Sequence, residues 1–198
     1  MRELLVATNN DGKLAEFRRL LSGLPVHVVG PAEIGLELTV PEPHLTYADN
    51  ARDKALAFAR ASGRLTLADD SGIEVAALDW GPGARSARWM VAKAGDNADT
   101  LLDRLEGVSD RRARMVCWLA LAEPGPEEPS VELFSGTVEG RVATGRRGSG
   151  GFGYDPIFEL PSGLTTAELA PEEKDRLSHR GQAVAAASPR LRSLAGAP

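Results

Sequence analysis

Short apolar runs recur along the chain and are separated by stretches in which apolar residues have helical spacing. The runs that predict strands cover residues 4–7, 26–29, 65–68, 73–78, 114–121 and 131–138. Helical spacing and capping residues predict helices around residues 13–21, 46–63 and 96–107, and from Pro171 and Ser178 onward. The last two strands are joined by a polar connection, so we expect them to pair antiparallel within a mixed sheet. The pattern therefore predicts an α/β fold.

Length, composition and charge narrow the class of protein. The 198 residues, 42% of them hydrophobic, suit one large globular domain or two small lobes. The net charge of -5 argues against binding of a nucleic acid polymer along an extended face. No apolar run is long enough to span a bilayer, and the amino terminus lacks the pattern of a signal peptide. We therefore expect no membrane partner and a cytoplasmic location, with the single cysteine, Cys117, buried as a small hydrophobe.

Two adjacent carboxylates end the apolar run of residues 65–68. Asp69 and Asp70 are expected where a buried strand leaves the core. Burying two anions without a partner costs several kcal/mol of solvation each, so a cation should lie beside them. The alternative is that Asp-Asp-Ser-Gly is only a polar turn, because these are common turn residues.

The polar loop of residues 8–13 lies between the first strand and the first helix. Free backbone N–H groups and the helix dipole favour an anion at such a loop, and Lys13 adds a mobile positive charge. The loop does not have the Walker spacing. Phosphate binding is one interpretation, and a simple helix cap with a solvated lysine is the other.

Glu42 stands between two prolines, which hold the local backbone extended. A rigidly placed carboxylate suits a role at a metal, although a solvated loop glutamate is the alternative. On the next predicted helix, Asn50 and Lys54 share one face, one turn apart. We expect both at the surface unless the neighbouring loops bury them.

The segment of residues 148–158 contains four glycines within six residues. Glycines let the backbone approach a ligand closely, and Phe152 offers a flat face on which a base can stack. Asp155 is constrained by the proline that follows it. The alternative is a glycine-rich hairpin turn with core aromatics. His179 and Arg180 follow at a helix start, where such a pair usually lies on the surface.

Together these segments supply the groups that a nucleoside triphosphate with Mg²⁺ requires, since hard oxygen ligands suit this ion. The candidate metal ligands are Glu42, Asp69 and Asp70. The candidate phosphate ligands are Thr8, Asn10 and Lys13, and the candidate base-binding residues are Phe152, Asp155, Lys174, His179 and Arg180. The three histidines are isolated and do not have the spacing of a zinc site.

Five motifs in the order ATNNDGK, LADDSG, SAR, GGFGYDPIF and SHRGQA resemble the inosine/xanthosine triphosphate pyrophosphatases. The resemblance extends from about residue 4 to residue 187. It implies an elongated mixed β-sheet flanked by helices, with residues 1–198 forming a single two-lobed domain and an active-site cleft between the lobes. It also implies a homodimer and Mg²⁺-dependent hydrolysis of deaminated purine nucleoside triphosphates (ITP, dITP and XTP) to the monophosphate and pyrophosphate.

The resemblance also implies roles for individual residues. Asp70 corresponds to the catalytic base and metal ligand, with Asp69 and Glu42 supporting the metal. The residues implied for binding of the small-molecule purine substrate are Thr8, Asn9, Asn10, Lys13, Ser71, Phe152, Gly153, Tyr154, Asp155, Lys174, His179 and Arg180. Three departures from the family pattern occur. Pro43 and His44 follow Glu42 where the family often has Thr-Gly, Asp49 replaces a common glutamate, and Arg85 replaces a usual aromatic or aliphatic residue.

Two other functions stay open. One is a pyrophosphatase of similar fold that acts on modified pyrimidine nucleotides, against which the SHRGQA and FGYDP matches argue. The other is a nucleotide-binding regulator without turnover, which the intact Asp69, Asp70 and Lys13 disfavour.

Overall fold

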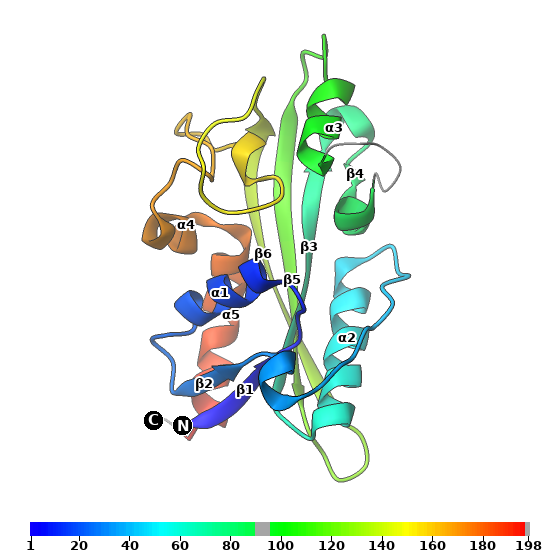
Figure 1. The fold of residues 1–198 in the computed structure, drawn as a ribbon, viewed down its shortest axis with the longest axis vertical. Helices are drawn as coiled ribbons and strands as arrows, with labels where there is room; N and C mark the ends of the chain where they lie inside the picture. The colour runs from blue at the N-terminus through cyan, green and yellow to red at the C-terminus, as the bar shows by residue number, and fades with distance from the viewer. Residues whose placement is uncertain (90–95, 197–198) are drawn as a thin grey trace.

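The computed structural model describes residues 1–89 and 96–196, and one long mixed sheet organises them (Figure 1). Its strands are β1 (Arg2–Val6), β2 (Val26–Val29), β3 (Thr66–Val75), β4 (Gly81–Pro82), β5 (Arg112–Glu123), β6 (Ser130–Val142) and β7 (Phe158–Glu159). The order is β2-β1-β3-β5-β6-β7, with β4 also paired to β3. β1 is parallel to β2 and β3, and the other pairs are antiparallel. The predicted mixed sheet, with the antiparallel pair β5 and β6, is confirmed.

The helices in the described residues are α1 (Asp11–Leu20), α2 (Tyr47–Ser62), α3 (Asn97–Arg104), α4 (Pro171–Leu177) and α5 (His179–Leu194). Four of them, α1, α2, α3 and α5, begin at side-chain caps that satisfy free backbone N–H groups, and α4 begins with a proline in its first turn. Thr46 accepts a hydrogen bond from the Asp49 N–H, and Ser178 accepts one from the Gly181 N–H. Both predicted caps are therefore confirmed. Short 3₁₀ turns cover Pro31–Ile34, Ala76–Leu78, Gly83–Arg88 and Asp155–Ile157.

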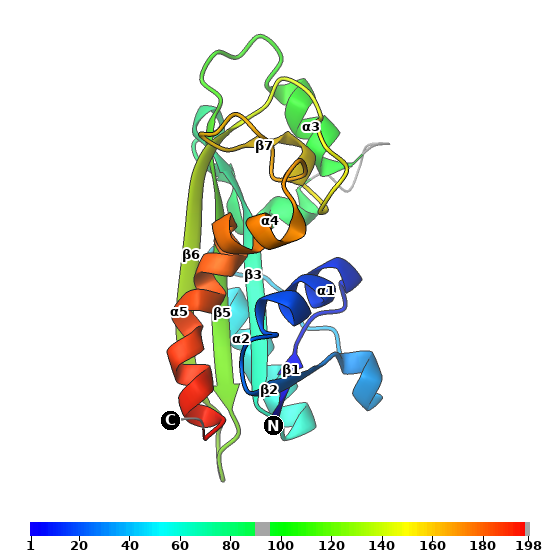
Figure 2. The ribbon, with the colours of Figure 1, turned by 90° about the vertical axis from the view of Figure 1, so that its left-hand side faces the viewer.

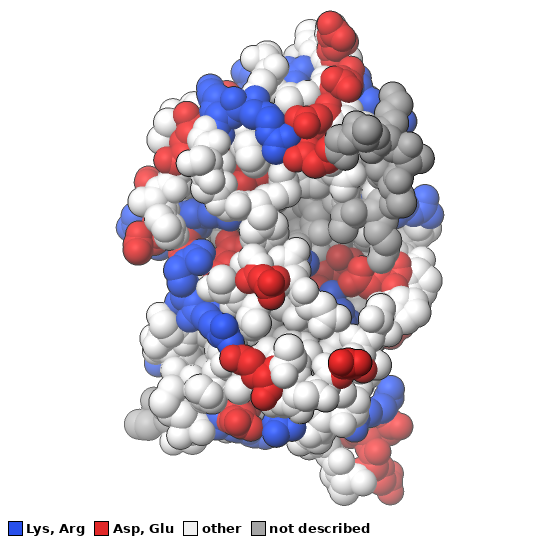
Figure 3. Space-filling view, viewed as in Figure 1, with Lys and Arg blue, Asp and Glu red and all other residues white. Residues whose placement is uncertain are grey.

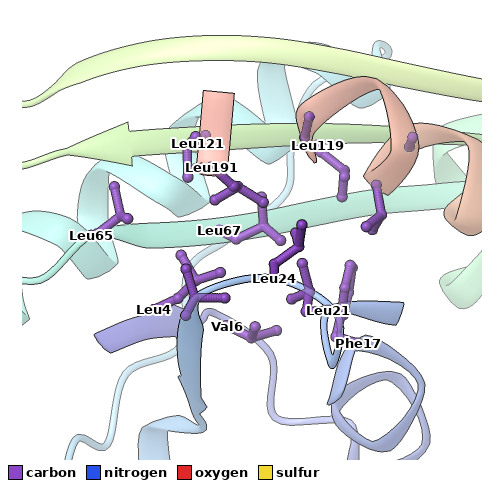
Figure 4. Packing of buried hydrophobic residues seen from close by; sticks show 14 of the residues in the cluster. Leu4, Val6, Phe17, Leu21, Leu24, Leu65, Leu67, Leu119, Leu121 and Leu191 are labelled. Carbon is purple, nitrogen blue, oxygen red and sulfur yellow. The ribbon is translucent and has the colours of Figure 1, made fainter. Parts of the chain in front are cut away.

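Helices cover both faces of the sheet. Helices α1 and α5 pack on one face, where Phe17 and Leu191 meet Leu67 and Leu119 in a fully buried cluster (Figure 4). Helix α2 packs on the other face against alanines of β3 and β5. Figure 2 shows α5 lying along β5 and β6. Each face is thus buried under its own helix layer.

A separate apolar cluster lies at the far end of the long strands. There α3 packs with the ends of β3, β5 and β6 and with the segment that follows the glycine-rich loop, residues 148–153 (Figure 2). Ile73, Leu101, Leu105, Ile157 and Phe158 are fully buried in it. This cluster fixes the glycine-rich loop relative to the sheet.

Strand β3 runs without a break through Asp69, Asp70 and Gly72, so the prediction of two strands separated by a turn is wrong. Every residue of β3 pairs with a residue of β5. A Cβ atom at Gly72 would lie 2.4 Å from Ser86 Oγ, so glycine is required for this close approach. The Ser86 hydroxyl in turn accepts a hydrogen bond from the Ile73 N–H at 2.9 Å. These long-range contacts override the local turn preference.

Acidic and basic side chains are interspersed on the face shown in Figure 3. Among the helices of the described residues, none has the length and apolar character that a bilayer crossing requires. Cys117 is buried and reduced, as predicted.

Candidate active site

The candidate site lies where, among the described residues, one edge of β3 has no neighbouring strand. On that edge β3 pairs with β1 through Thr66 and Leu67, and with β4 through Glu74 and Val75. A pocket of about 350 Å³ opens at the gap between them. The predicted site residues that line it are Asn10, Lys13, Glu42, Asp70, Ser71, Phe152, Gly153, Tyr154, Asp155, His179 and Arg180.

Asp69 and Asp70 point to opposite faces of the sheet, because successive side chains of a strand alternate. Asp69 lies on the face of Leu67, which α1 and α5 cover. Asp70 lies on the face of Ala68, which α2 covers. The structure therefore gives the two neighbouring carboxylates different partners.

Asp69 is 1% exposed and is neutralised by two cations. Its Oδ2 accepts from Lys13 Nζ at 2.8 Å, from Ser71 Oγ at 3.1 Å and from Arg180 Nη2 at 3.4 Å. Burial by itself would raise the pKa of Asp69, but the charges of Lys13 and Arg180 hold that pKa far below its usual range. The predicted cation beside the buried acids is confirmed, and Lys13 is an ion-pair partner, not a solvated side chain.

A carboxylate that the sequence did not indicate completes this side of the site. Glu16 of α1 is 1% exposed, and its Oε2 accepts from Arg180 Nη1 at 2.5 Å. Its Oε1 lies 3.4 Å from Lys174 Nζ. No motif marks Glu16, and Arg180 lies 164 positions away in the chain. In the sequence, only the position of Glu16 directly before the apolar Phe17 of the predicted helix indicates that it could be buried.

Asp70 is 6% exposed and is held by amide groups. Its Oδ2 accepts from Asn50 Nδ2 at 2.9 Å, and its Oδ1 accepts from the Ser71 N–H at 2.9 Å. Burial raises the pKa of Asp70 to about 6, an effect that the Asn50 hydrogen bond opposes and the charge of Glu42 reinforces. Asp70 is therefore a carboxyl group that can exchange a proton near neutral pH.

The expectation that Asn50 and Lys54 lie at the surface is wrong. Asn50 is 1% exposed, and Lys54 is half-buried and donates to Glu42 Oε1 at 2.6 Å. Burial lowers the pKa of Lys54, but the charges of Asp69 and Glu42 raise it above its usual value overall. The loop before α2 therefore folds onto this helix, and Glu42 lines the pocket.

The glycine-rich loop wraps around the carboxylate of Asp155, which is buried. Its Oδ2 accepts from the Phe152 N–H and from Lys174 Nζ, both at 2.7 Å, and its Oδ1 accepts from Thr166 Oγ1 at 2.9 Å. Gly151 has a φ of 71°, and a Cβ atom there would lie 2.1 Å from Asp155 Oδ2. Asp155 therefore holds Phe152 and Lys174 in place.

Phe152 closes one side of the pocket. The Lys174 ammonium lies 5.2 Å from the centre of its ring, and the Arg180 guanidinium lies 5.6 Å from it. A Cβ atom at Gly12 would lie 3.1 Å from the ring, so Phe152 packs against the start of α1. Lys174 lines a separate hollow behind the ring. A flat ring beside cations suits the stacking of a base.

The first residues of α5 lie at the pocket. His179 and Arg180 are buried, so the expectation of a surface pair is wrong. Burial and the charges of Arg180 and Lys174 lower the pKa of His179 well below its usual value, which keeps the ring neutral at pH 7. Tyr154 and Ser86 also line the pocket, and the Tyr154 hydroxyl donates to the Ser86 carbonyl at 2.9 Å, which fixes the position of the Tyr154 ring.

The loop before α1 turns only partly toward the pocket. Asn10 lines the pocket and caps α1 by accepting the Lys13 N–H at 3.0 Å. Thr8 Oγ1 accepts from the Asn10 N–H at 3.2 Å. The exposed Asn9 donates to the Leu38 carbonyl at 3.2 Å, outside the pocket. Arg85 also lies outside it, in the hollow beside Trp80.

Comparison with known proteins identifies the family. The Ham1 family model matches residues 4–190. The chain belongs to the Ham1 family. The dITP/XTP pyrophosphatase of Methylococcus capsulatus is 44% identical to this Ham1-family chain over 200 residues, 98% of each protein. The dITP/XTP pyrophosphatase of Staphylococcus epidermidis is 41% identical over 187 residues, 93% of each.

Solved structures of other Ham1 proteins have the same fold. The Ham1 protein of Staphylococcus aureus matches with a TM-score of 0.83 and 37% identity, and that of Coxiella burnetii with a TM-score of 0.84 and 39% identity. Each match covers 98% of this chain and 100% of the other. The predicted α/β fold and the resemblance stated from the motifs are therefore confirmed.

Two carboxylates of this Ham1-family pocket fit a magnesium ion. Glu42 and Asp70 both line the pocket, and Mg²⁺ is commonly bound by one or two carboxylates together with phosphate oxygens and waters. Among residues 1–89 and 96–196, no three His, Cys, Asp or Glu side chains form a metal-binding group. Asp69 lies on the opposite face of β3, so the structure does not assemble Glu42, Asp69 and Asp70 as one ligand set.

Proposed function

We propose that this Ham1-family chain hydrolyses deaminated purine nucleoside triphosphates, namely ITP, dITP and XTP, to the nucleoside monophosphate and pyrophosphate. The observation that carries the proposal is the carboxyl group of Asp70, which lies at the pocket with a pKa raised to about 6. A base with such a pKa can take a proton from an attacking water at neutral pH. The two relatives named dITP/XTP pyrophosphatase support this choice of substrate.

The pocket divides into a phosphate end and a base end. Lys13, Asn10 and Thr8 serve the phosphates, since the loop before α1 combines an ammonium group with a helix start. The base end is formed by Phe152, Gly153, Tyr154, His179 and Arg180, with Ser71 between the two ends. Asp155, Lys174 and Asp69 hold these groups in position, and Asn9, whose side chain donates to the Leu38 carbonyl, holds the loop that carries Thr8 and Asn10.

Glu42 and Asp70 would hold Mg²⁺ at the phosphate end. When bound, the ion supplies positive charge that neutralises phosphate oxygens during attack at phosphorus. Asp70 orients and deprotonates the water, while the ammonium group of Lys13, which is paired with Asp69 and lines the pocket, neutralises charge on the departing pyrophosphate. Arg180 also neutralises the carboxylate of Asp69.

Base selectivity follows from buried donors. The Nε of Arg180 is buried and lacks a hydrogen-bond partner among the described residues. A 6-oxo purine can accept a hydrogen bond from such a donor, whereas the 6-amino group of adenine cannot. ATP is therefore rejected. A site that forms a hydrogen bond to the 6-oxo group discriminates strongly against a base that lacks this group.

The family resemblance supports three wider proposals. The chain acts as a homodimer, works in the cytoplasm and forms one two-lobed domain over residues 1–198 with the pocket in the cleft. The purine nucleotide is its small-molecule partner.

The proposal is tested by pyrophosphate release from ITP, XTP, GTP, ATP and dTTP, with and without Mg²⁺. We expect Mg²⁺-dependent release from ITP and XTP, slowed by at least about 100-fold in the Asp70→Asn variant. Binding of ITP without any product would replace the enzyme by a nucleotide-binding regulator. A preference for dTTP would replace the purine substrate by a pyrimidine.

A further inference from the structure

Asn50 is a buried carboxamide whose orientation is fixed by a single neighbouring residue. Its Oδ1 accepts from the His44 N–H at 2.9 Å, and its Nδ2 donates to the His44 carbonyl at 3.2 Å. A carboxamide turned by half a rotation would place donor against donor and acceptor against acceptor at His44. The two bonds therefore determine which end of the Asn50 side chain is nitrogen.

The second hydrogen of that nitrogen is directed at Asp70. Nδ2 donates to Asp70 Oδ2 at 2.9 Å, while Asp70 Oδ1 accepts from the Ser71 N–H at 2.9 Å. Each oxygen of the carboxylate thus has one fixed donor. A carboxylate oxygen offers two lone-pair directions, and Asp70 lines the pocket, so each oxygen can accept a further hydrogen bond there.

The same face of α2 also holds the other carboxylate of the pocket. Lys54 lies one turn after Asn50 and donates to Glu42 Oε1 at 2.6 Å. The His44 bonds to Asn50 tie the loop that carries Glu42 to this helix. One turn of α2 therefore fixes the positions of both carboxylates, those of Glu42 and Asp70.

We propose that Asn50 is a positioning residue for Asp70, which fixes the plane of its carboxylate and its placement relative to Glu42. This inference rests on the proposed function, in which Asp70 receives the proton of the attacking water. Rate depends steeply on such placement, since a shift of about 1 Å can cost on the order of 100-fold. The described residues that line the pocket do not include Asn50.

The test uses Asn50→Ala, which removes the donor, and Asn50→Asp, which keeps the shape and replaces the donor by an acceptor. We expect kcat for ITP to fall about 10-fold to 100-fold in Asn50→Ala and at least as far in Asn50→Asp. KM for ITP should change less than about threefold, as should the Kd for ITP measured by calorimetry in Mg²⁺-free buffer, because substrate contacts are intact.

The matched control is Ser62→Ala, which removes a polar group at the other end of α2, where Ser62 Oγ bonds to the Phe58 carbonyl. It should lower the unfolding midpoint without changing kcat per folded molecule. The inference is overturned if Asn50→Ala keeps kcat within twofold, if its loss of kcat equals its loss of folded protein, or if KM rises while kcat stays unchanged. Failure of the proposed function looks different, because the wild-type protein would then release no pyrophosphate.

Discussion

Two neighbouring carboxylates on β3 have opposite surroundings. Asp69 faces α1 and α5 and contacts Lys13 and Arg180, whose charges depress its pKa. Asp70 faces α2 and meets the Asn50 carboxamide and a backbone N–H, and burial raises its pKa to about 6. Two residues of one motif therefore have different partners, because successive side chains of a strand point to opposite faces of the sheet.

The different surroundings give Asp69 a structural role and Asp70 a chemical one. A carboxylate with two cations is stable as an anion and cannot serve as a base at neutral pH. A carboxyl group held by neutral donors retains basicity and open lone pairs. Asp69 therefore organises the cations of the site, whereas Asp70 is available for proton transfer.

Asp70→Asn should cause the largest loss of activity. Removal of a general base costs about 100-fold to 10,000-fold in rate, so kcat for ITP should fall within or beyond that range. ITP binding in Mg²⁺-free buffer should persist, since the phosphate and base groups are untouched. Steady-state kinetics and calorimetry on the same preparation check both statements. Equal losses for Asp69→Asn and Asp70→Asn would remove the distinction between the two faces.

Asp69→Asn should act mainly on stability. It removes one of the two carboxylates that form ion pairs with the buried Arg180 among the described residues, leaving Glu16, and takes from Lys13 its ion-pair partner. Breaking a buried pair from one side costs about 3 to 5 kcal/mol of unfolding free energy. Urea unfolding measures the change. Asp110→Asn is the control, because Asp110 pairs with Arg112 at the surface, where solvent screening leaves such a pair little effect on the unfolding free energy. Similar losses for the two variants would refute the assignment.

A pH titration of stability sharpens the contrast further. The folded-state pKa of Asp70 lies above its unfolded value, so its contribution to stability is present at low pH and is lost as pH rises through about 6. Asp70→Asn has no such group. In buffer with a chelator, the unfolding free energy of the variant relative to wild type should therefore increase by about 1 to 2 kcal/mol from pH 5 to pH 8. If the difference in unfolding free energy between variant and wild type does not change across this range, the pKa of Asp70 is not raised.

Apolar spacing predicts most of the fold because it reflects local burial. It locates β1, β2, β5, β6 and the five helices. It fails at β3, where Asp-Asp-Ser-Gly has the composition of a turn. Pairing with β5 and the contact of Gly72 with Ser86 keep the strand extended, and neither partner is near in the chain.

The candidate site shows the same limit. Motifs identify Lys13, Asp70 and Phe152, since their residue types and spacing carry the chemistry. They do not identify Glu16 or Asn50, whose roles depend on partners that only the tertiary structure brings together. A charged or amide side chain on a helix is indistinguishable from a surface residue until its neighbours are known.

The smallest expected effect concerns Ser71, which belongs to the face of Asp69. Its hydroxyl donates to Asp69 Oδ2 at 3.1 Å and accepts from Arg180 Nη2 at 2.9 Å. Ser71→Ala removes both bonds but leaves both ion pairs of Asp69, so unfolding free energy should fall by only about 1 kcal/mol. Because Ser71 lines the pocket, KM for ITP should rise while kcat stays within about threefold of wild type. A large loss of kcat would mean that the Ser71 hydroxyl also affects Asp70, whose Oδ1 accepts from the Ser71 N–H. The two faces of β3 would then be coupled.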